Sequence, residues 1–353
     1  MHIEKIIHDP VFQLNLVLWM AKEQSAQCFQ VRPLFHQYGF SPLVIEQPFK
    51  FPVALSRQID AASTLDISKE PEPEVILEKQ ATNQAIYFEC KAQSFGPTSS
   101  NSKQARGHLL ATGTAFAEVF HPREHCLLSY LVPDSDRARM SACLASLHSE
   151  LSSGGFSPGT FSIHGLKSDG LSISYTWDKA FTEHLGLAES QPQEIPVLEN
   201  ITPETDPSPL MLVYTDEDCP DQESRNHYRR VLSEKLRASM LCDLNQEQGE
   251  GGFSLSADEL LHNTTGGMFK YLGRERQKNM QLFVRNNIFN FIVSDWEKKV
   301  PALASLEGQT LTLTWGTDEN RQNFLEWLED RKNIFPAERI REIQSNLFDS
   351  GSK

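Results

Sequence analysis

The stretch from Pro73 to Lys91 reads PEVILEKQATNQAIYFECK, and it decides the fold that we expect for the first half of the chain. Two runs rich in apolar and β-branched residues, 75–77 and 85–92, flank the turn-forming residues 81–84. Apolar runs of this kind on either side of turn residues are typical of strands. The stretch therefore predicts two strands joined by a tight connection.

Charged side chains occupy defined positions on these two strands. Because side chains alternate between the two faces of a strand, Tyr87, Glu89 and Lys91 should share one face. Glu74 stands at the start of the first strand, so Glu74 and Glu89 can converge if the strands are neighbours. Two convergent carboxylates are hard oxygen ligands suited to Mg²⁺ or Mn²⁺. A metal held in this way polarises a phosphoryl oxygen and lowers the pKa of bound water, and a nearby ammonium steadies charge on phosphorus.

This arrangement resembles the PD-(D/E)xK nuclease superfamily, which has the restriction-endonuclease-like fold. Pro73-Glu74 matches the PD element, with Glu in place of the usual Asp, and Glu89 with Lys91 matches the (D/E)xK element. The resemblance covers about residues 9–185. It implies an α/β fold with a mixed sheet flanked by helices. It also implies that Glu74 and Glu89 hold Mg²⁺ or Mn²⁺ and that Lys91 positions water or stabilises the transition state.

Two further site residues follow from the resemblance. Family members often carry a glutamine on the helix after the third strand, and Gln104 is the counterpart in Lys103-Gln104-Ala105-Arg106-Gly107-His108. Many members also use an acid from the first helix, and Glu23, near the end of the first expected helix, is a weaker candidate for that position.

Each of these residues also has an ordinary structural interpretation. A Glu-x-Lys sequence on a strand is often only a solvated face. Glu74 can be one more charge in the acidic Pro-Glu run 70–74, and Gln104 can be a plain helix residue. Tyr87 can pack against the helix without any catalytic part.

The length of 353 residues exceeds what one hydrophobic core usually organises, so two domains are expected. Residues 1–187 form the nuclease-like domain, 188–209 hold five prolines and form a linker, and 210–353 form a mostly helical α+β domain for substrate or partner binding. The expected helices are 9–27, 103–120, 136–151, 221–244, 318–331 and 337–347, with a mainly helical pattern over 257–299. The other expected strands are 43–46, 125–132, 160–164, 171–176, 210–214 and 310–315.

Charge limits the classes of partner. Lys and Arg number 33 against 47 Asp and Glu, a formal net charge of -14, which excludes a broadly basic surface. The segment 263–299 reverses this balance, and its basic residues interleave with aromatic ones. They are candidate DNA contacts, or else a basic helical face that meets an acidic partner or solvent. The four candidates are Lys270, Arg274, Arg276 and Lys278.

Several other classes find no support in the sequence. No apolar run is long enough to span a bilayer, and the N-terminus lacks the pattern of a secretory signal. None of the six cysteines forms a Cys-x-x-Cys pair, which favours reduced thiols in a cytoplasmic protein over disulfides or zinc. The glycine pairs lack the lysine of a phosphate loop, and no Gly-x-Ser-x-Gly elbow is present.

The leading functional hypothesis is a Mg²⁺-dependent endonuclease that cleaves DNA in repair, restriction or phage defence. The alternative is a non-catalytic, nuclease-like scaffold subunit of a bacterial defence or DNA-processing complex, which the net acidity favours. A sequence-reading regulator that uses the C-terminal helices is a third possibility, although no helix-turn-helix pattern stands out. A partner protein or a homo-oligomer is compatible with all three.

Overall fold

The computed structural model divides the chain into two compact units. The N-terminal unit comprises Met1–Leu210 with Tyr271–Gly273, and the C-terminal unit comprises Met211–Lys270 with Arg274–Lys353. The residues that the structure describes are 3–23, 31–62, 64–120, 125–186, 193–200, 210–214, 219, 221–246 and 252–330.

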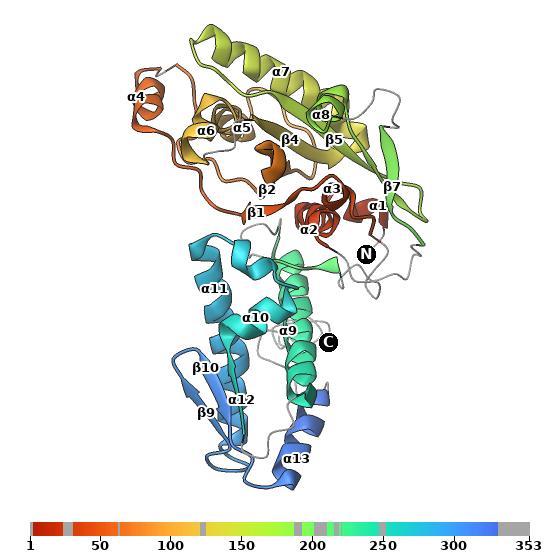
Figure 1. Cartoon of the computed structure of the whole chain (residues 1–353), viewed down its shortest axis with the longest axis vertical. Coiled ribbons are helices and arrows are strands. Elements are labelled where there is room, and N and C mark those ends of the chain that lie inside the picture. Colours follow the sequence, from red (N-terminus) through yellow and green to blue (C-terminus); the bar gives the residue numbers. More distant parts are fainter. Residues whose placement is uncertain are drawn as a thin grey trace, which may run out of the picture. The chain divides into compact units, whose positions relative to one another are not determined.

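The N-terminal unit is built on a seven-stranded mixed sheet whose spatial order follows the chain (Figure 1). β4 is parallel to both of its neighbours, β3 and β5, and the other pairs are antiparallel. The expected α/β architecture with a mixed sheet flanked by helices is therefore confirmed. The strands are β1 (Ser41–Ile45), β2 (Val75–Lys79), β3 (Gln84–Cys90), β4 (His125–Pro133), β5 (Phe161–Ser168), β6 (Ile173–Thr176) and β7 (Glu194–Leu198).

β2 and β3 form the hairpin that the quoted stretch predicts. Lys79 pairs with Gln84, and a single 3₁₀ turn, Gln80–Thr82, joins the strands. Asn83 closes the turn in the left-handed conformation, with φ of 53°, which Asn tolerates better than most residues. Both strands are largely buried because helices cover both faces of the sheet.

The helices divide between the two faces of this sheet (Figure 1). On one face, Phe35 of α3 lies 5.3 Å from Phe88 and 6.1 Å from Phe181 of α8, measured between ring centroids. On the other, α5 and α7 cover a continuous core that includes Tyr87 and Tyr130 of the sheet. The helices are α1 (Ile3–Ile6), α2 (Pro10–Ala21), α3 (Leu34–Gln37), α4 (Val53–Ala61), α5 (Ser100–Ala111), α6 (Thr114–Val119), α7 (Arg137–Ser153) and α8 (Lys179–His184).

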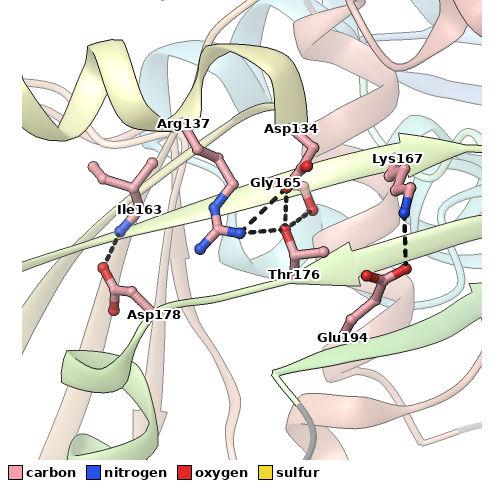
Figure 2. Close-up of polar contacts among 8 residues, drawn as sticks. All are labelled: Asp134, Arg137, Ile163, Gly165, Lys167, Thr176, Asp178 and Glu194. Atoms are coloured by element: carbon pink, nitrogen blue, oxygen red, sulfur yellow. Dashed lines mark hydrogen bonds and ion pairs between the residues drawn. The ribbon is translucent and has the colours of Figure 1, made fainter.

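A polar cluster ties β5 and β6 to the start of α7 (Figure 2). The Thr176 hydroxyl donates to Asp134 Oδ1 at 2.7 Å, and Arg137 Nη1 donates to the same oxygen at 3.2 Å. These side chains lie directly over Gly165, where an added Cβ would come within 2.5 Å of atoms from all three. The cluster therefore needs a residue without a side chain at position 165.

Gly165→Ala should lower the free energy of unfolding by about 1–3 kcal/mol, because the new methyl group must displace the whole polar cluster. Urea unfolding measures this loss. Gly96→Ala is the matched control, since an added Cβ there meets nothing within 4 Å, and its stability should stay within about 0.5 kcal/mol of wild type. Equal stability of the two variants would contradict the packing around Gly165.

The C-terminal unit combines helices with a three-stranded antiparallel sheet of order β8-β10-β9. Its aromatic core includes Trp296, whose ring centroid lies 5.2 Å from that of Phe324 and 5.9 Å from that of Trp327. A π-helical turn, Arg285–Phe289, joins α11 to α12. The elements are α9 (Gln222–Gln246), β8 (Phe253–Ser256), α10 (Ala257–Thr264), α11 (Arg274–Val284), α12 (Asn290–Trp296), β9 (Ala304–Glu307), β10 (Thr310–Leu313) and α13 (Asp318–Glu329).

Some expectations differ from the structure. β7 lies inside the segment 188–209, so the prediction of a linker does not hold for residues 194–198. Residues 210–214 are buried but form no strand, because an apolar run alone does not separate a strand from another buried segment. The expected helix 337–347 lies outside the described residues.

No helix within the described ranges combines the length and the apolar character needed to cross a bilayer.

Candidate active site

Glu74 directly precedes β2, next to the end of β3 that contains Glu89. Val75 pairs with Phe88, and Glu74, one residue before it, donates its backbone N–H to Phe88 O at 3.1 Å. Regular antiparallel pairing therefore ends at Val75, because this bond is shifted by one residue from the register that pairs Val75 with Phe88. Glu89 lies on the side of the sheet that α5 covers, near His108, and the negative charge of Glu74 acts on the ammonium of Lys91.

Glu89 is the most deeply buried carboxylate of the arrangement, with 1% of its side chain exposed. Its Oε1 accepts a hydrogen bond from Lys91 Nζ at 2.5 Å, and the Lys91 side chain remains 20% exposed. The Lys91 backbone is held on both sides. Its N–H donates to Leu131 O at 2.9 Å, and Gln13 Nε2 of α2 donates to Lys91 O at 3.1 Å. Lys91 thus projects from a fixed backbone toward Glu89.

The charges around Lys91 keep its ammonium protonated. Burial acts to lower the pKa of Lys91, but the negative charges of Glu89 and Glu74 together outweigh it, so the pKa is raised. Lys91 is therefore a permanent cation at neutral pH and a poor proton acceptor.

A neutral polar layer lies beneath Glu89. His108 of α5 places Nδ1 at 3.7 Å from Glu89 Oε2 and at 3.1 Å from the Tyr130 hydroxyl. Burial, and then the Lys91 charge, holds the pKa of His108 well below its usual range, so the imidazole is neutral. Burial, and then the Glu89 charge, raises the pKa of both Tyr87 and Tyr130 well above the usual value. Neither phenol ionises near neutral pH.

Gln104 lies on the helix that covers the site. It is half-buried on α5 and precedes His108 by four residues, so the two share one side of the helix. Within the part of the chain that the structure describes, no hydrogen bond joins Gln104 to Glu89 or Lys91. Gln104 therefore lies on the same side of α5 as His108 but forms no hydrogen bond with Glu89 or Lys91.

Glu23 does not belong to this site, so that expectation was wrong. The residue of α2 that contacts Lys91 is Gln13, near the start of the helix. The eight residues from Gln13 to the end of α2 at Ala21, at ~1.5 Å each, already cover about 12 Å of helix axis, and Glu23 lies beyond that end. Glu23 itself is exposed beyond the end of α2 at Ala21.

The basic residues expected to contact DNA differ in their accessibility. Lys270, Arg274 and Lys278 are exposed, whereas Arg276 is buried. The three exposed side chains keep the predicted role as candidates. The prediction is not met for Arg276, because a phosphate contact needs an accessible guanidinium.

The donor set suits a hard cation that takes part of its coordination from elsewhere. Among the described residues, no group of three or more His, Cys, Asp and Glu side chains is arranged to hold a metal ion. Magnesium in phosphoryl-transfer sites is usually bound through one or two carboxylates, and water and substrate phosphate oxygens complete its shell. Glu74 and Glu89 are oxygen donors of the chemical kind that such a site uses.

No protein-family model, no curated protein and no solved structure matches this chain. The chemistry of the site therefore rests on its own residues. These are a buried carboxylate bonded to a charged lysine, a second carboxylate whose charge acts on that lysine, and a neutral histidine close to the first carboxylate.

The sequence did not indicate His108 or Tyr130 as members of this cluster. The signal for His108 was its position one helical turn after Gln104. Tyr130 stands directly beside Glu89 because β3 and β4 pair in parallel with Glu89 opposite Tyr130. A register between strands separated by two helices leaves no local mark on the sequence.

Proposed function

We propose that the N-terminal unit is a metal-dependent endonuclease that hydrolyses phosphodiester bonds in DNA. The observation that carries this proposal is the bond between the Lys91 ammonium and the buried Glu89 carboxylate, with the charge of Glu74 acting on the same ammonium. The resemblance of the sequence to the PD-(D/E)xK nucleases points to the same three residues. The mixed sheet flanked by helices supports the proposal as a compatible scaffold.

Each residue has a separate part in this proposal. Glu74 and Glu89 would hold Mg²⁺ or Mn²⁺, which when bound polarises a phosphoryl oxygen and makes water more acidic. The raised pKa of Lys91 favours an electrostatic part, in which the ammonium stabilises negative charge that develops on the phosphate. Gln104 would support the scissile phosphate or the attacking water from α5.

The DNA would need further contacts. Lys270, Arg274 and Lys278 are exposed cations that suit phosphate oxygens. The net charge of -14 disfavours tight binding of duplex DNA by the protein alone. We therefore propose that a partner protein or a second copy of the chain contributes to binding.

The second candidate function is a nuclease-like scaffold without catalysis. The observation that favours it is the Lys91–Glu89 ion pair itself, because a buried carboxylate neutralised by its own lysine needs no metal. The net acidity of the chain also favours it. In this case the three charged residues would serve folding and would leave DNA intact.

Incubation with plasmid and linear DNA in Mg²⁺ or Mn²⁺, with EDTA as the blank, separates the two candidates. We expect the wild type to nick DNA, and we expect the cleavage rate to fall by at least about 100-fold in Glu89→Gln and in Lys91→Ala. Glu78→Gln is the matched control, since Glu78 is a buried carboxylate at the far end of β2.

Two outcomes would decide against the nuclease site. Nicking that persists in both Glu89→Gln and Lys91→Ala would show that other residues cut DNA. No nicking by the wild type in either metal would favour the scaffold.

A further inference from the structure

Gln13 is a buried amide in the largely apolar helix α2, and its side-chain nitrogen makes two hydrogen bonds. The residue has no exposed surface. Its Nε2 donates to Ile7 O at 2.7 Å and to Lys91 O at 3.1 Å. Carbonyl oxygens only accept, so the nitrogen and not the oxygen of the amide must face these two groups. Burial of an amide is unfavourable unless it is hydrogen-bonded, and these two bonds tie α2 to the backbone of Lys91.

His8 makes a second link between the same two segments. It lies in the turn between α1 and α2, and its Nδ1 is 3.0 Å from the carbonyl oxygen of Ala92, the residue after Lys91. Because that oxygen only accepts, Nδ1 must carry a proton. The start of α2 is therefore joined to two consecutive carbonyl groups, through the side chains of Gln13 and His8.

Lys91 lies beyond the regular pairing of its own strand. β3 pairs with β2 as far as Phe88 and with β4 as far as Cys90. The Lys91 N–H still donates to Leu131 O at 2.9 Å, but the Lys91 carbonyl follows the last pair of both ladders. The Gln13 amide thus supplies from a helix the hydrogen bond that continued strand pairing would otherwise give.

The position of this backbone decides where the Lys91 ammonium can reach. Nζ donates to Glu89 Oε1 at 2.5 Å, although the Lys91 side chain is still 20% exposed. A lysine side chain is a flexible stem with a strongly hydrated head, so water competes with Glu89 for the ammonium. A shift of the Lys91 backbone would favour the solvated positions over the bond to Glu89.

We propose that Gln13 is a positioning residue for Lys91, because it holds the backbone from which the ammonium reaches Glu89. This inference rests on the proposed function for the electrostatic part that Lys91 plays in DNA cleavage. Gln13 acts through the Lys91 carbonyl and, being fully buried, touches neither DNA nor a metal ion. His8 supports the same segment at the next carbonyl.

Trace acetylation of the full chain with acetic anhydride, followed by mass spectrometry, reports the state of the Lys91 ammonium without any need for DNA cleavage. Only an accessible, unprotonated amine reacts, so the bond to Glu89 slows the acetylation of Lys91. Gln13→Met keeps an unbranched side chain of similar length and removes the donor. It should raise the Lys91 rate, relative to that of the exposed Lys103, by about 3- to 10-fold, the equivalent of one lost hydrogen bond.

Two further variants set the scale of this change. Glu89→Gln removes the partner of the ammonium and should give the largest increase in the Lys91 rate. His8→Ala removes only the link to Ala92 and should give a smaller increase than Gln13→Met. If Gln13→Met does not fold, His8→Ala decides the inference by the same comparison, because His8 is exposed and its loss is tolerated more easily.

Gln84→Met is the matched control. Gln84 lies at the other end of β3, and its Nε2 likewise donates to a backbone carbonyl oxygen, that of His184 at 2.7 Å. This variant loses the same kind of bond on the same strand, so it should leave the Lys91 rate and DNA cleavage unchanged. Thermal unfolding shows which variants remain folded at the temperature of labelling.

DNA cleavage gives the second measurement. In plasmid nicking, Gln13→Met should lower kcat by about 10-fold, because a displaced charge loses its effect on the transition state. KM for DNA and the Kd for Mn²⁺ should stay at the wild-type values, since Gln13 contacts neither.

The possible failures are distinguishable. If Glu89→Gln raises the Lys91 rate but Gln13→Met and His8→Ala leave it unchanged, the positioning role of Gln13 is overturned. A wild-type chain that cuts no DNA in Mg²⁺ or Mn²⁺ overturns the proposed function, and the acetylation rates still decide whether Gln13 places the ammonium on Glu89.

Discussion

Lys91→Met should lower the free energy of unfolding of the N-terminal unit by about 2–4 kcal/mol, because it leaves the Glu89 carboxylate buried without its ammonium. Glu89 is only 1% exposed, and Lys91 Nζ is bonded directly to its Oε1. Removal of one partner from a buried ion pair is strongly destabilising, and the residual exposure of Lys91 reduces the cost somewhat. Methionine keeps an unbranched stem of similar length, so little of the loss comes from packing.

Substitution of the other partner of the ion pair should lower the free energy of unfolding by less. In Glu89→Gln the remaining charge belongs to Lys91, whose side chain is 20% exposed and can turn its ammonium toward water. The double variant Glu89→Gln with Lys91→Met contains neither charge, so it should recover most of the stability that Lys91→Met loses.

Urea unfolding of the two single variants and the double variant forms a double-mutant cycle that measures the pair. The double variant also separates folding from catalysis, because it should be stable and still fail to cut DNA in Mg²⁺ or Mn²⁺. If Lys91→Met were as stable as wild type, Glu89 would have to reach solvent or be protonated, and the buried ion pair would be disproved. A stable double variant that still cleaves DNA would remove Lys91 and Glu89 from the proposed mechanism.

The β2–β3 hairpin was predictable because all the information lies within one short stretch. Alternation set the face that Tyr87 and Glu89 share, and the turn residues set where the chain reverses. Similar local patterns predicted α7 and β4, although the structure moves their ends by a residue or two.

The remaining features depend on contacts between distant parts of the chain. β7 contains Pro196, and a proline-spaced segment looks like a linker until its pairing with β6 is known. β8 and β9 are four residues each and become strands only by pairing with β10. His108 and Tyr130 meet Glu89 through helix packing and a parallel register, which have no signature in local sequence.

Acid should destabilise the N-terminal unit as the pH falls below about 6.5, because buried histidines must stay neutral in the folded state. Burial lowers the pKa of His164 to about 3, an effect that Asp178 partly offsets and Arg137 reinforces. Burial likewise lowers the pKa of His184 to about 4. The ordinary value for both is 6.5, so between that pH and the folded pKa the unfolded chain binds a proton that the folded chain does not.

The direction of the stability change and the pH range in which it occurs follow from this difference in pKa between the folded and the unfolded chain. Well above pH 6.5, where the imidazole is neutral in both the folded and the unfolded chain, His164 contributes no pH dependence. As the pH falls from about 6.5 toward about 3, His164 alone should remove up to about 1.4 kcal/mol of unfolding free energy per pH unit.

Urea unfolding at pH 7.5, 6.5, 5.5 and 4.5 measures the slope of the unfolding free energy against pH. His164→Phe should make it shallower by about that amount per unit, whatever it does to stability at pH 7.5. An identical slope in wild type and His164→Phe would mean that the imidazole is protonated in the folded chain, which its apolar contacts with Phe88 and Phe181 oppose.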